Sequence, residues 1–202
     1  MDIQTVWQCG QRDIRVSTDG GQAWESTGVA PGRDCTVSFV DAQTGWVFGS
    51  LATQATADGG QTWTEIALPE GVQRATAISL RTPDEGYLLT PDAALYATRD
   101  GGESWSRLPL DLEAYGELTL LPSNLATAAI RFFDADTGVV VLSLVGGGQS
   151  KVVALRTTDG GQTWTEEEVP AEPGVLYLTR DGRFLTVHSL LKAGTITVLE
   201  HK

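Results

Sequence analysis

Hydrophobic and polar residues alternate along this chain in short runs, and glycine-containing turns separate the runs. The segment Thr36-Val-Ser-Phe-Val40 is one example of the alternation. A period of two over four to eight residues is typical of a β-strand with one buried face. The pattern therefore predicts an all-β chain of short antiparallel strands joined by tight turns.

One octapeptide, Ser/Thr-x-Asp-Gly-Gly-x-x-Trp, occurs four times, at residues 17–24, 56–63, 98–105 and 157–164. Its successive aspartates lie 39, 42 and 59 residues apart. Periods of about 40 residues made of short strands are the signature of propeller blades. The repeat thus predicts a β-propeller.

The octapeptide has the chemistry of a turn. Its aspartate accepts hydrogen bonds from backbone N–H groups just downstream, and its glycines supply backbone angles closed to other residues. Its tryptophan enters the next strand and buries a large flat surface. We therefore expect structural roles for Asp19, Trp24, Asp58, Trp63, Asp100, Trp105, Asp159 and Trp164.

A second repeat precedes the boxes: Val40-Asp-Ala-Gln-Thr-Gly-Trp46 matches residues 133–139, and residues 80–87 are a looser copy. One blade then consists of strand A, this turn, strand B, a loop, strand C, the Asp-box turn and strand D. The whole chain, 1–202, fits one propeller domain of about five four-stranded blades, at about residues 5–28, 34–69, 73–110, 125–170 and 174–202. The first blade lacks strand A, and the fifth lacks a box and strand D.

These motifs resemble a known family. Trp7-Gln-Cys-Gly10, a box such as Thr56–Trp63, and Phe39-Val-Asp-Ala-Gln-Thr-Gly-Trp46 together are most similar to Asp-box (BNR) propellers of the photosystem II assembly and stability factor family. The resemblance covers about residues 5–170. It implies an extracytoplasmic binding scaffold without catalysis, usually with more blades than this chain supplies.

Asp boxes also occur in sialidases, xyloglucanases and sortilin-type receptors, so the box indicates a fold and not a function. The Arg-Ile-Pro motif of sialidases is absent, and the 11 arginines are scattered. Xyloglucanases use two aspartates on facing blades, and 26 acidic residues leave such a pair open. A carbohydrate-binding or glycosidase-like propeller is therefore the alternative function, and a structural blade array within a larger protein is a third.

The charge balance limits the classes of binding partner that we expect. The formal net charge is −12 and only three basic residues are lysines, which argues against nucleic acid or anionic membranes as partners. No stretch approaches the ~20 apolar residues of a membrane span. We expect an extracytoplasmic location, with the signal segment absent from this sequence. For Cys9 and Cys35 the sequence favours two buried thiols and leaves a disulfide open.

Departures from the repeat indicate where a partner binds. A long connection at residues 111–124, containing Tyr115, and an enlarged loop at residues 146–150, containing Gln149, fall on the face opposite the boxes. Loops held by a rigid scaffold commonly carry binding function. Arg33 and Arg74 align with each other at the start of strand A on that face and could hold a carboxylate. Pairing with local acids such as Asp34 is the alternative role for these arginines.

Three further motifs fail as chemical sites. Residues 134–138 resemble the start of a calcium loop, but Val145 stands at the twelfth position. Residues 146–151 lack the glycine that precedes lysine in a phosphate loop. His188 and His201 have no nucleophile motif nearby. We predict no catalytic residue, metal or cofactor, but a scaffold that binds a protein partner and could self-associate through its incomplete end blades.

Overall fold

The computed structural model describes residues 4–10, 12–32, 35–51, 53–122 and 127–167, together with the backbone of three strands between 175 and 199. These residues form antiparallel sheets and one short 3-10 helix, η1 (Glu113–Tyr115). None of the described helical residues makes a segment long and apolar enough to cross a membrane.

The strands belong to five sheets, which we number in chain order. The first sheet contains β1 (Val6–Cys9), β2 (Ile14–Ser17) and β3 (Glu25–Ser26). The second contains β4 (Thr36–Phe39), β5 (Gly45–Phe48), β6 (Thr53–Thr56) and β7 (Thr64–Glu65). The third contains β8 (Ala77–Leu80), β9 (Gly86–Leu89), β10 (Leu95–Thr98) and β11 (Ser106–Leu108).

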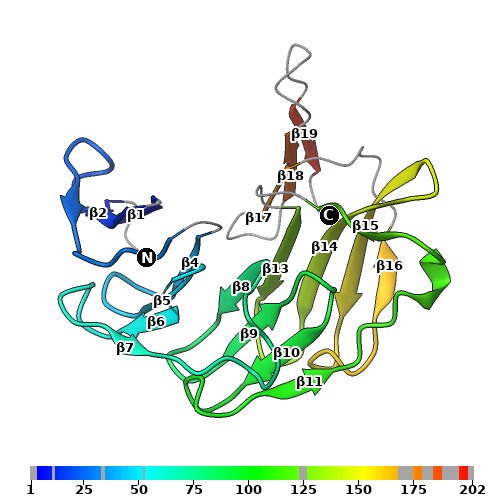
Figure 1. Ribbon diagram of the computed structural model, residues 1–202, viewed down its shortest axis with the longest axis horizontal. Helices are drawn as coiled ribbons and strands as arrows, with labels where there is room; N and C mark the ends of the chain where they lie inside the picture. Colours follow the sequence, from blue (N-terminus) through cyan, green and yellow to red (C-terminus); the bar gives the residue numbers. More distant parts are fainter. Residues whose placement is uncertain are drawn as a thin grey trace.

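The fourth sheet contains β12 (Thr119–Leu120), β13 (Ala128–Phe132), β14 (Gly138–Gly146), β15 (Gln149–Thr157) and β16 (Thr165–Glu167). The fifth contains β17 (Val175–Leu178), β18 (Phe184–Val187) and β19 (Ile196–Leu199). The sheets follow one another around a common centre, with β4, β8, β13 and β17 innermost (Figure 1). Each innermost strand contacts the next, so the sheets pack in chain order.

The Asp box is a closed local network, as in the copy at residues 98–105. The Thr98 hydroxyl donates to Asp100 Oδ1 at 2.7 Å and accepts from the Gly102 N–H at 3.0 Å. Asp100 Oδ1 also accepts from the Ser104 N–H at 2.9 Å. The Gly101 N–H donates to the Asp84 carbonyl at 2.9 Å, which ties the box to the turn between β8 and β9. The other three boxes make the same bond from their first glycine to the equivalent turn or the segment before β1.

The second sequence repeat is an Asx turn. Asp41 Oδ1 accepts from the Gln43 and Thr44 N–H groups at 2.8 and 2.6 Å, and Asp134 makes the same pair of bonds. The calcium-like motif at residues 134–138 is therefore a turn between β13 and β14. Hydrogen bonds from backbone N–H groups hold the pKa of Asp134 below its usual value.

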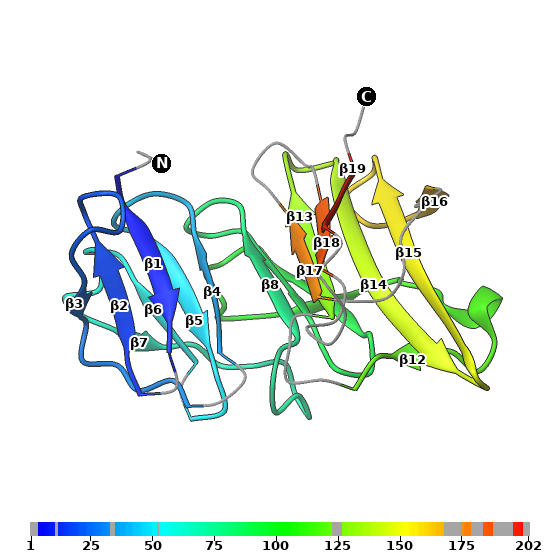
Figure 2. The same ribbon diagram turned by 90° about the horizontal axis from the view of Figure 1, so that it is seen from above.

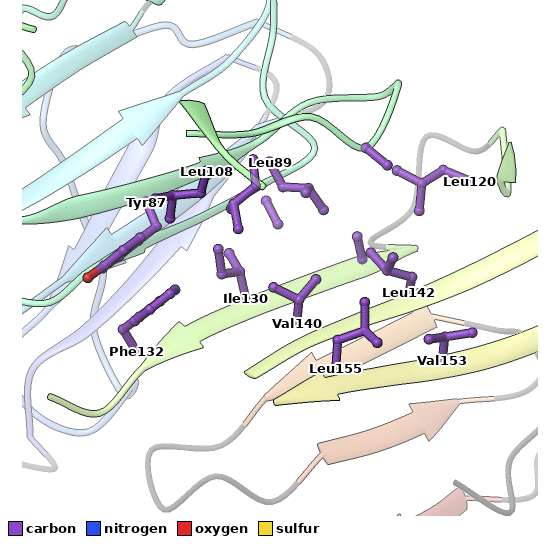
Figure 3. Packing of buried hydrophobic residues seen from close by; sticks show 14 of the residues in the cluster. Tyr87, Leu89, Leu108, Leu120, Ile130, Phe132, Val140, Leu142, Val153 and Leu155 are labelled. Carbon is purple, nitrogen blue, oxygen red and sulfur yellow. The ribbon is translucent and has the colours of Figure 1, made fainter. Parts of the chain in front are cut away.

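Aromatic rings fill the spaces between successive sheets. Trp7 of β1 stacks on Phe39 of β4 at 3.8 Å, and Tyr87 of β9 stacks on Phe132 of β13 at 3.5 Å. Trp46 of β5 is buried and meets Trp105 edge-on at 5.9 Å. Figure 3 shows the apolar side chains of the third and fourth sheets facing one another, with Tyr87 and Phe132 at one end.

A regular apolar contact also joins successive boxes. A Cβ placed on Gly60 would lie 3.0 Å from Thr27 Cγ2 of the preceding sheet. The corresponding distances are 2.5 Å from Gly102 to Ile66 and 2.8 Å from Gly161 to Leu108. Thr27, Ile66 and Leu108 each lie three residues after a box tryptophan. The second glycine of a box is thus where the preceding sheet approaches too closely for a side chain.

Two sequence expectations need correction. The interpretation of Cys9 and Cys35 as thiols is wrong: they form a disulfide, with Cα atoms 5.9 Å apart, because the end of β1 meets the residue just before β4. The enlarged loop expected at 146–150 is largely strand. β14 and β15 run to a two-residue turn at Gly147 and Gly148, whose φ angles of 56° and 77° suit the favoured hairpin turn.

Candidate binding surface

The four predicted binding residues fall in different parts of the structure. Arg33 lies outside the described residues. Arg74 is exposed and lies in the connection before β8. Tyr115 ends η1, in the connection from β11 to β12, and Gln149 is the exposed first residue of β15. Antiparallel order puts the start of β8 and the turn between β14 and β15 at the same end of their sheets, away from the boxes.

The structure joins the two insertions that the sequence showed separately. β12 pairs with the far part of β14, with Thr119 opposite Val145 and Leu120 opposite Leu144. A Cβ at Gly146 would lie 2.6 Å from the Glu117 carbonyl oxygen, so only glycine allows this approach. Figure 2 shows β14 and β15 as the longest strands, with β12 near the end of β14. The connection holding Tyr115 and the hairpin holding Gln149 therefore form one unit.

Hydrogen bonds from Tyr115 and Lys151 to Glu166 connect this unit to β16. The Tyr115 hydroxyl donates to Glu166 Oε2 at 2.8 Å, and Lys151 Nζ donates to Glu166 Oε1 at 2.6 Å. Lys151 Nζ also lies 4.9 Å from the centre of the Tyr115 ring. We call Tyr115, Gln149, Lys151 and Glu166 the β12–β16 surface.

Hydrogen bonds and burial within this surface shift the pKa values of Glu166 and Tyr115. The hydrogen bond from Lys151, and then that from Tyr115, lower the pKa of Glu166. Burial, followed by the hydrogen bond to Glu166, raises the pKa of Tyr115. The surface therefore presents a neutral phenol beside a carboxylate, which suits hydrogen bonding to a polypeptide.

Sequence reasoning missed Lys151 and Glu166. They are 15 residues apart, and the register of β15 on β16, with Leu155 opposite Glu166, does not place them directly opposite each other. Their contacts with Tyr115 depend on the path of residues 111–124 beside the sheet. No sequence pattern predicts that path.

The box aspartates are unsuited to proton transfer. Hydrogen bonds from Thr62, in its hydroxyl and backbone N–H, lower the pKa of Asp58 to about 2. Ser104 and Thr163 act in the same way on Asp100 and Asp159, whose pKa values also fall to about 2. A general acid or base works best with a pKa near the operating pH. The structural role of these residues stays a prediction.

Metal-ligating side chains do not gather in the part of the chain that the structure describes. No group of three or more His, Cys, Asp or Glu residues is placed to hold an ion there.

Solved structures with this arrangement are β-propellers. A structure of YCF48 bound to a D1 peptide has a TM-score of 0.56 and 28% sequence identity, over 76% of this chain and 46% of that one. YCF48 from Cyanidioschyzon merolae matches 92% of this chain and 88% of that one, with a TM-score of 0.50 and 17% identity. An ancestral GH74 enzyme has a TM-score of 0.58 and 16% identity, over 96% of this chain and 28% of that one. The fold class is therefore all-β with propeller-type sheets.

The sequence narrows the class to a family. Residues 22–124, just over half of the chain, match the model of the photosynthesis system II assembly factor YCF48, and residues 155–166 match the BNR/Asp-box repeat. The chain belongs to the photosynthesis system II assembly factor YCF48 family. It spans about half the length of the peptide-bound YCF48 that it matches. No curated protein matches the chain.

Proposed function

We propose that this protein is a non-catalytic scaffold that binds a peptide segment of a partner protein during assembly. The observation that carries the proposal is the 28% identity to a YCF48 structure whose bound ligand is a D1 peptide. The low pKa values of the box aspartates support a role without acid–base catalysis.

The proposed binding residues are Arg74, Tyr115 and Gln149, with Arg33 as a fourth that lies outside the described residues. Arg74 is exposed and supplies a cation suited to a carboxylate. The β12–β16 surface adds hydrogen-bonding groups at the same end of the sheets. We also propose that the five sheets are the blades of one propeller domain, 1–202, with a box between the third and fourth strands of each complete blade.

An extracytoplasmic location goes with this proposal. The disulfide between Cys9 and Cys35 and the family membership are both consistent with a lumenal or other extracytoplasmic compartment. Carbohydrate binding is the weaker candidate, because the likeness to the GH74 enzyme is at 16% identity and concerns the fold alone.

Binding of a labelled D1 peptide to the whole chain tests the proposal. We expect saturable binding that Arg74→Ala weakens about tenfold, the loss of a charge-assisted hydrogen bond. Arg107→Ala, on the exposed side of β11, is the matched control and should leave the affinity unchanged. Absence of binding would contradict the proposed function, and equal effects of the two variants would contradict the assignment of Arg74.

Hydrolysis assays address the weaker candidate. Cleavage of a xyloglucan or a sialoside by the purified chain would contradict the non-catalytic role. The expected result is no turnover above that of the buffer.

A further inference from the structure

Each of the four Asp boxes contains an aspartate followed directly by a glycine, at residues 19–20, 58–59, 100–101 and 159–160. The glycine has no Cβ to shield its backbone nitrogen from the preceding side chain. That nitrogen can attack the aspartate Cγ, and the product rearranges to isoaspartate. The repeat therefore places a dipeptide prone to isomerisation at four turns of the same design.

The reaction needs only the chain and water. The glycine nitrogen forms a bond to the aspartate Cγ and gives up its proton, and the carboxyl group loses one oxygen as water, which leaves a five-membered succinimide. Water then adds to one of the two ring carbonyls. Opening at one carbonyl restores aspartate, and opening at the other gives isoaspartate, whose main chain runs through Cβ. The first step is fastest from the neutral carboxyl group, because its hydroxyl oxygen leaves as water.

Three boxes hold their carboxylate by both oxygens. Asp58 Oδ1 accepts from the Thr62 N–H at 2.9 Å, and Asp58 Oδ2 accepts from the Thr62 hydroxyl at 2.6 Å. Ser104 and Thr163 donate to the Oδ2 of their own aspartate at 2.5 and 2.6 Å. These bonds fix the plane of the carboxyl group and favour its ionised form. A pKa of about 2 instead of 3.8 leaves Asp58 with about 60-fold less neutral acid at any pH well above both values.

The first box lacks one of these bonds. Ala23 stands where the other boxes have threonine or serine. Asp19 Oδ1 accepts from the N–H groups of Gln22 and Ala23, both at 2.9 Å. Asp19 Oδ2 has no hydrogen-bond donor among the residues that the structure describes. One oxygen of this carboxyl group is therefore held less firmly than in the other boxes.

The attacking nitrogen does not distinguish the boxes. The Gly20 N–H donates to the Gln4 carbonyl at 2.8 Å, and the equivalent glycines donate to a backbone carbonyl at 2.8–2.9 Å. Succinimide formation must break this bond in every box. The difference between the boxes therefore lies in the carboxyl group and in the hydroxyl that does or does not reach it.

We propose that Asp19 is a site of spontaneous isomerisation in the folded protein, and that the hydroxyl four residues after the aspartate protects the other three boxes. Isoaspartate carries its free carboxyl group directly on Cα and has one more atom in its main chain. The bonds from Gln22 and Ala23 therefore cannot re-form with the same geometry, and the modification opens the first box. The site lies at the box end of the first sheet, away from Arg74 and the β12–β16 surface, so it does not rest on the proposed function.

Ageing of the whole chain in a mildly acidic buffer gives the first test. Tryptic digestion and electron-transfer mass spectrometry measure isoaspartate at each box over time. We expect Asp19 to convert about tenfold faster than the other three box aspartates, the change in neutral acid that one pKa unit represents. In the chain unfolded in urea every box is the same Asp-Gly dipeptide, and the four rates should be similar. Equal rates at the four boxes of the folded chain would overturn the proposal.

The second test moves the hydroxyl. Ala23→Thr should slow the conversion of Asp19 about tenfold. Ala23→Val is the matched control, because valine has the shape of threonine without the hydroxyl, and it should leave the rate unchanged. In the second box Thr62→Val should speed the conversion of Asp58 about tenfold, whereas Thr62→Ser keeps a hydroxyl and should not. Equal protection by Ala23→Thr and Ala23→Val would overturn the role of the hydroxyl.

A loss of folding in any variant is recognised in the same digest. Unfolding exposes all the boxes and raises their rates together, so each variant is scored by the rate at the altered box relative to the rate at Asp159. A ratio that Ala23→Thr leaves unchanged would contradict the proposal, whatever the stability of the variant.

Discussion

At the scale of single residues, the four boxes differ in one hydroxyl group. Thr62, Ser104 and Thr163 each donate a hydroxyl hydrogen bond to Oδ2 of their aspartate. The first box has Ala23 at this position, so Asp19 Oδ1 accepts backbone bonds while Oδ2 receives no such hydroxyl. The pKa of Asp19 is lowered by hydrogen bonds from the Ala23 N–H, the Ser17 hydroxyl and the Gln22 N–H, without a hydroxyl at position 23.

Ala23→Thr should supply the missing hydroxyl and lower the pKa of Asp19 further. The reverse change, Thr62→Ala, should raise the pKa of Asp58 from its value of about 2. NMR titration of the carboxyl carbons measures both. An Asp19 pKa unchanged by Ala23→Thr would show that the hydroxyl does not reach Oδ2.

The sign of the pH dependence follows from the direction of these shifts. The folded pKa of Asp58 lies at about 2, below the ordinary 3.8, so its stabilisation is complete above pH 3.8 and is lost as the pH falls towards 2. Urea unfolding should therefore separate the native chain from Thr62→Ala at pH 6, and the difference should vanish near pH 2. A difference that persists at pH 2 would mean that the threonine acts by packing.

At the scale of the element, each box is also a contact between sheets. Gly102 is buried and adopts φ +95°, and Ile66 of the preceding sheet lies against it. Gly21 of the first box has nearly the same φ, +94°, but among the described residues a Cβ placed on it would meet only its own Trp24, at 3.7 Å. Trp24 is correspondingly 37% exposed, whereas the other three box tryptophans are less exposed. The first box thus forms the Asp-box turn, but no described residue of another sheet packs against its second glycine.

Alanine substitutions at Gly21 and Gly102 distinguish the cost of backbone strain from the cost of overpacking, because the two glycines share a φ angle and differ in their contacts. Gly21→Ala should cost about 1 kcal/mol, the price of a left-handed angle for a residue with a Cβ. Gly102→Ala adds overpacking against Ile66 and should cost about 1–3 kcal/mol more. Urea unfolding of both variants measures the difference. Equal losses would show that Ile66 moves aside freely.

At the scale of the whole molecule, the disulfide secures the sheet that has the smallest share in the core. Only Ile14 and Ser17 of the first sheet are fully buried among the residues described, and neither belongs to the two main apolar clusters. Cys9 and Cys35 bridge 26 residues between the first and second sheets. A cross-link of this span stabilises by about 3 kcal/mol in the chain-entropy model.

Replacing both cysteines by serine should therefore loosen the first sheet selectively. Tryptic cleavage after Arg15 in β2 should accelerate by roughly a hundredfold, the factor that about 3 kcal/mol represents in an opening equilibrium. Cleavage after Arg107 in β11, read by mass spectrometry in the same digest, is the internal control. Equal acceleration at both sites would mean that the disulfide stabilises the whole array.

Much of the fold could be predicted because its rules are local. The boxes, the Asx turns at Asp41 and Asp134, and strands such as β8 and β9 depend on residues close in sequence. The disulfide, the pairing of β12 with β14, and the joining of Tyr115 with Lys151 and Glu166 depend on contacts between distant segments. The functional roles of Arg74, Tyr115 and Gln149 stay predictions, and Arg33 lies outside the described residues.

The contact between Ile66 and Gly102 has a consequence for how such chains change over generations. Because each sheet touches its neighbours through the same few positions, duplication or loss of one unit leaves the remaining contacts intact. In the fourth sheet Glu167 stands at this position and pairs with Arg156. An ion pair within the fourth sheet thus stands where the earlier sheets present a side chain to the next box.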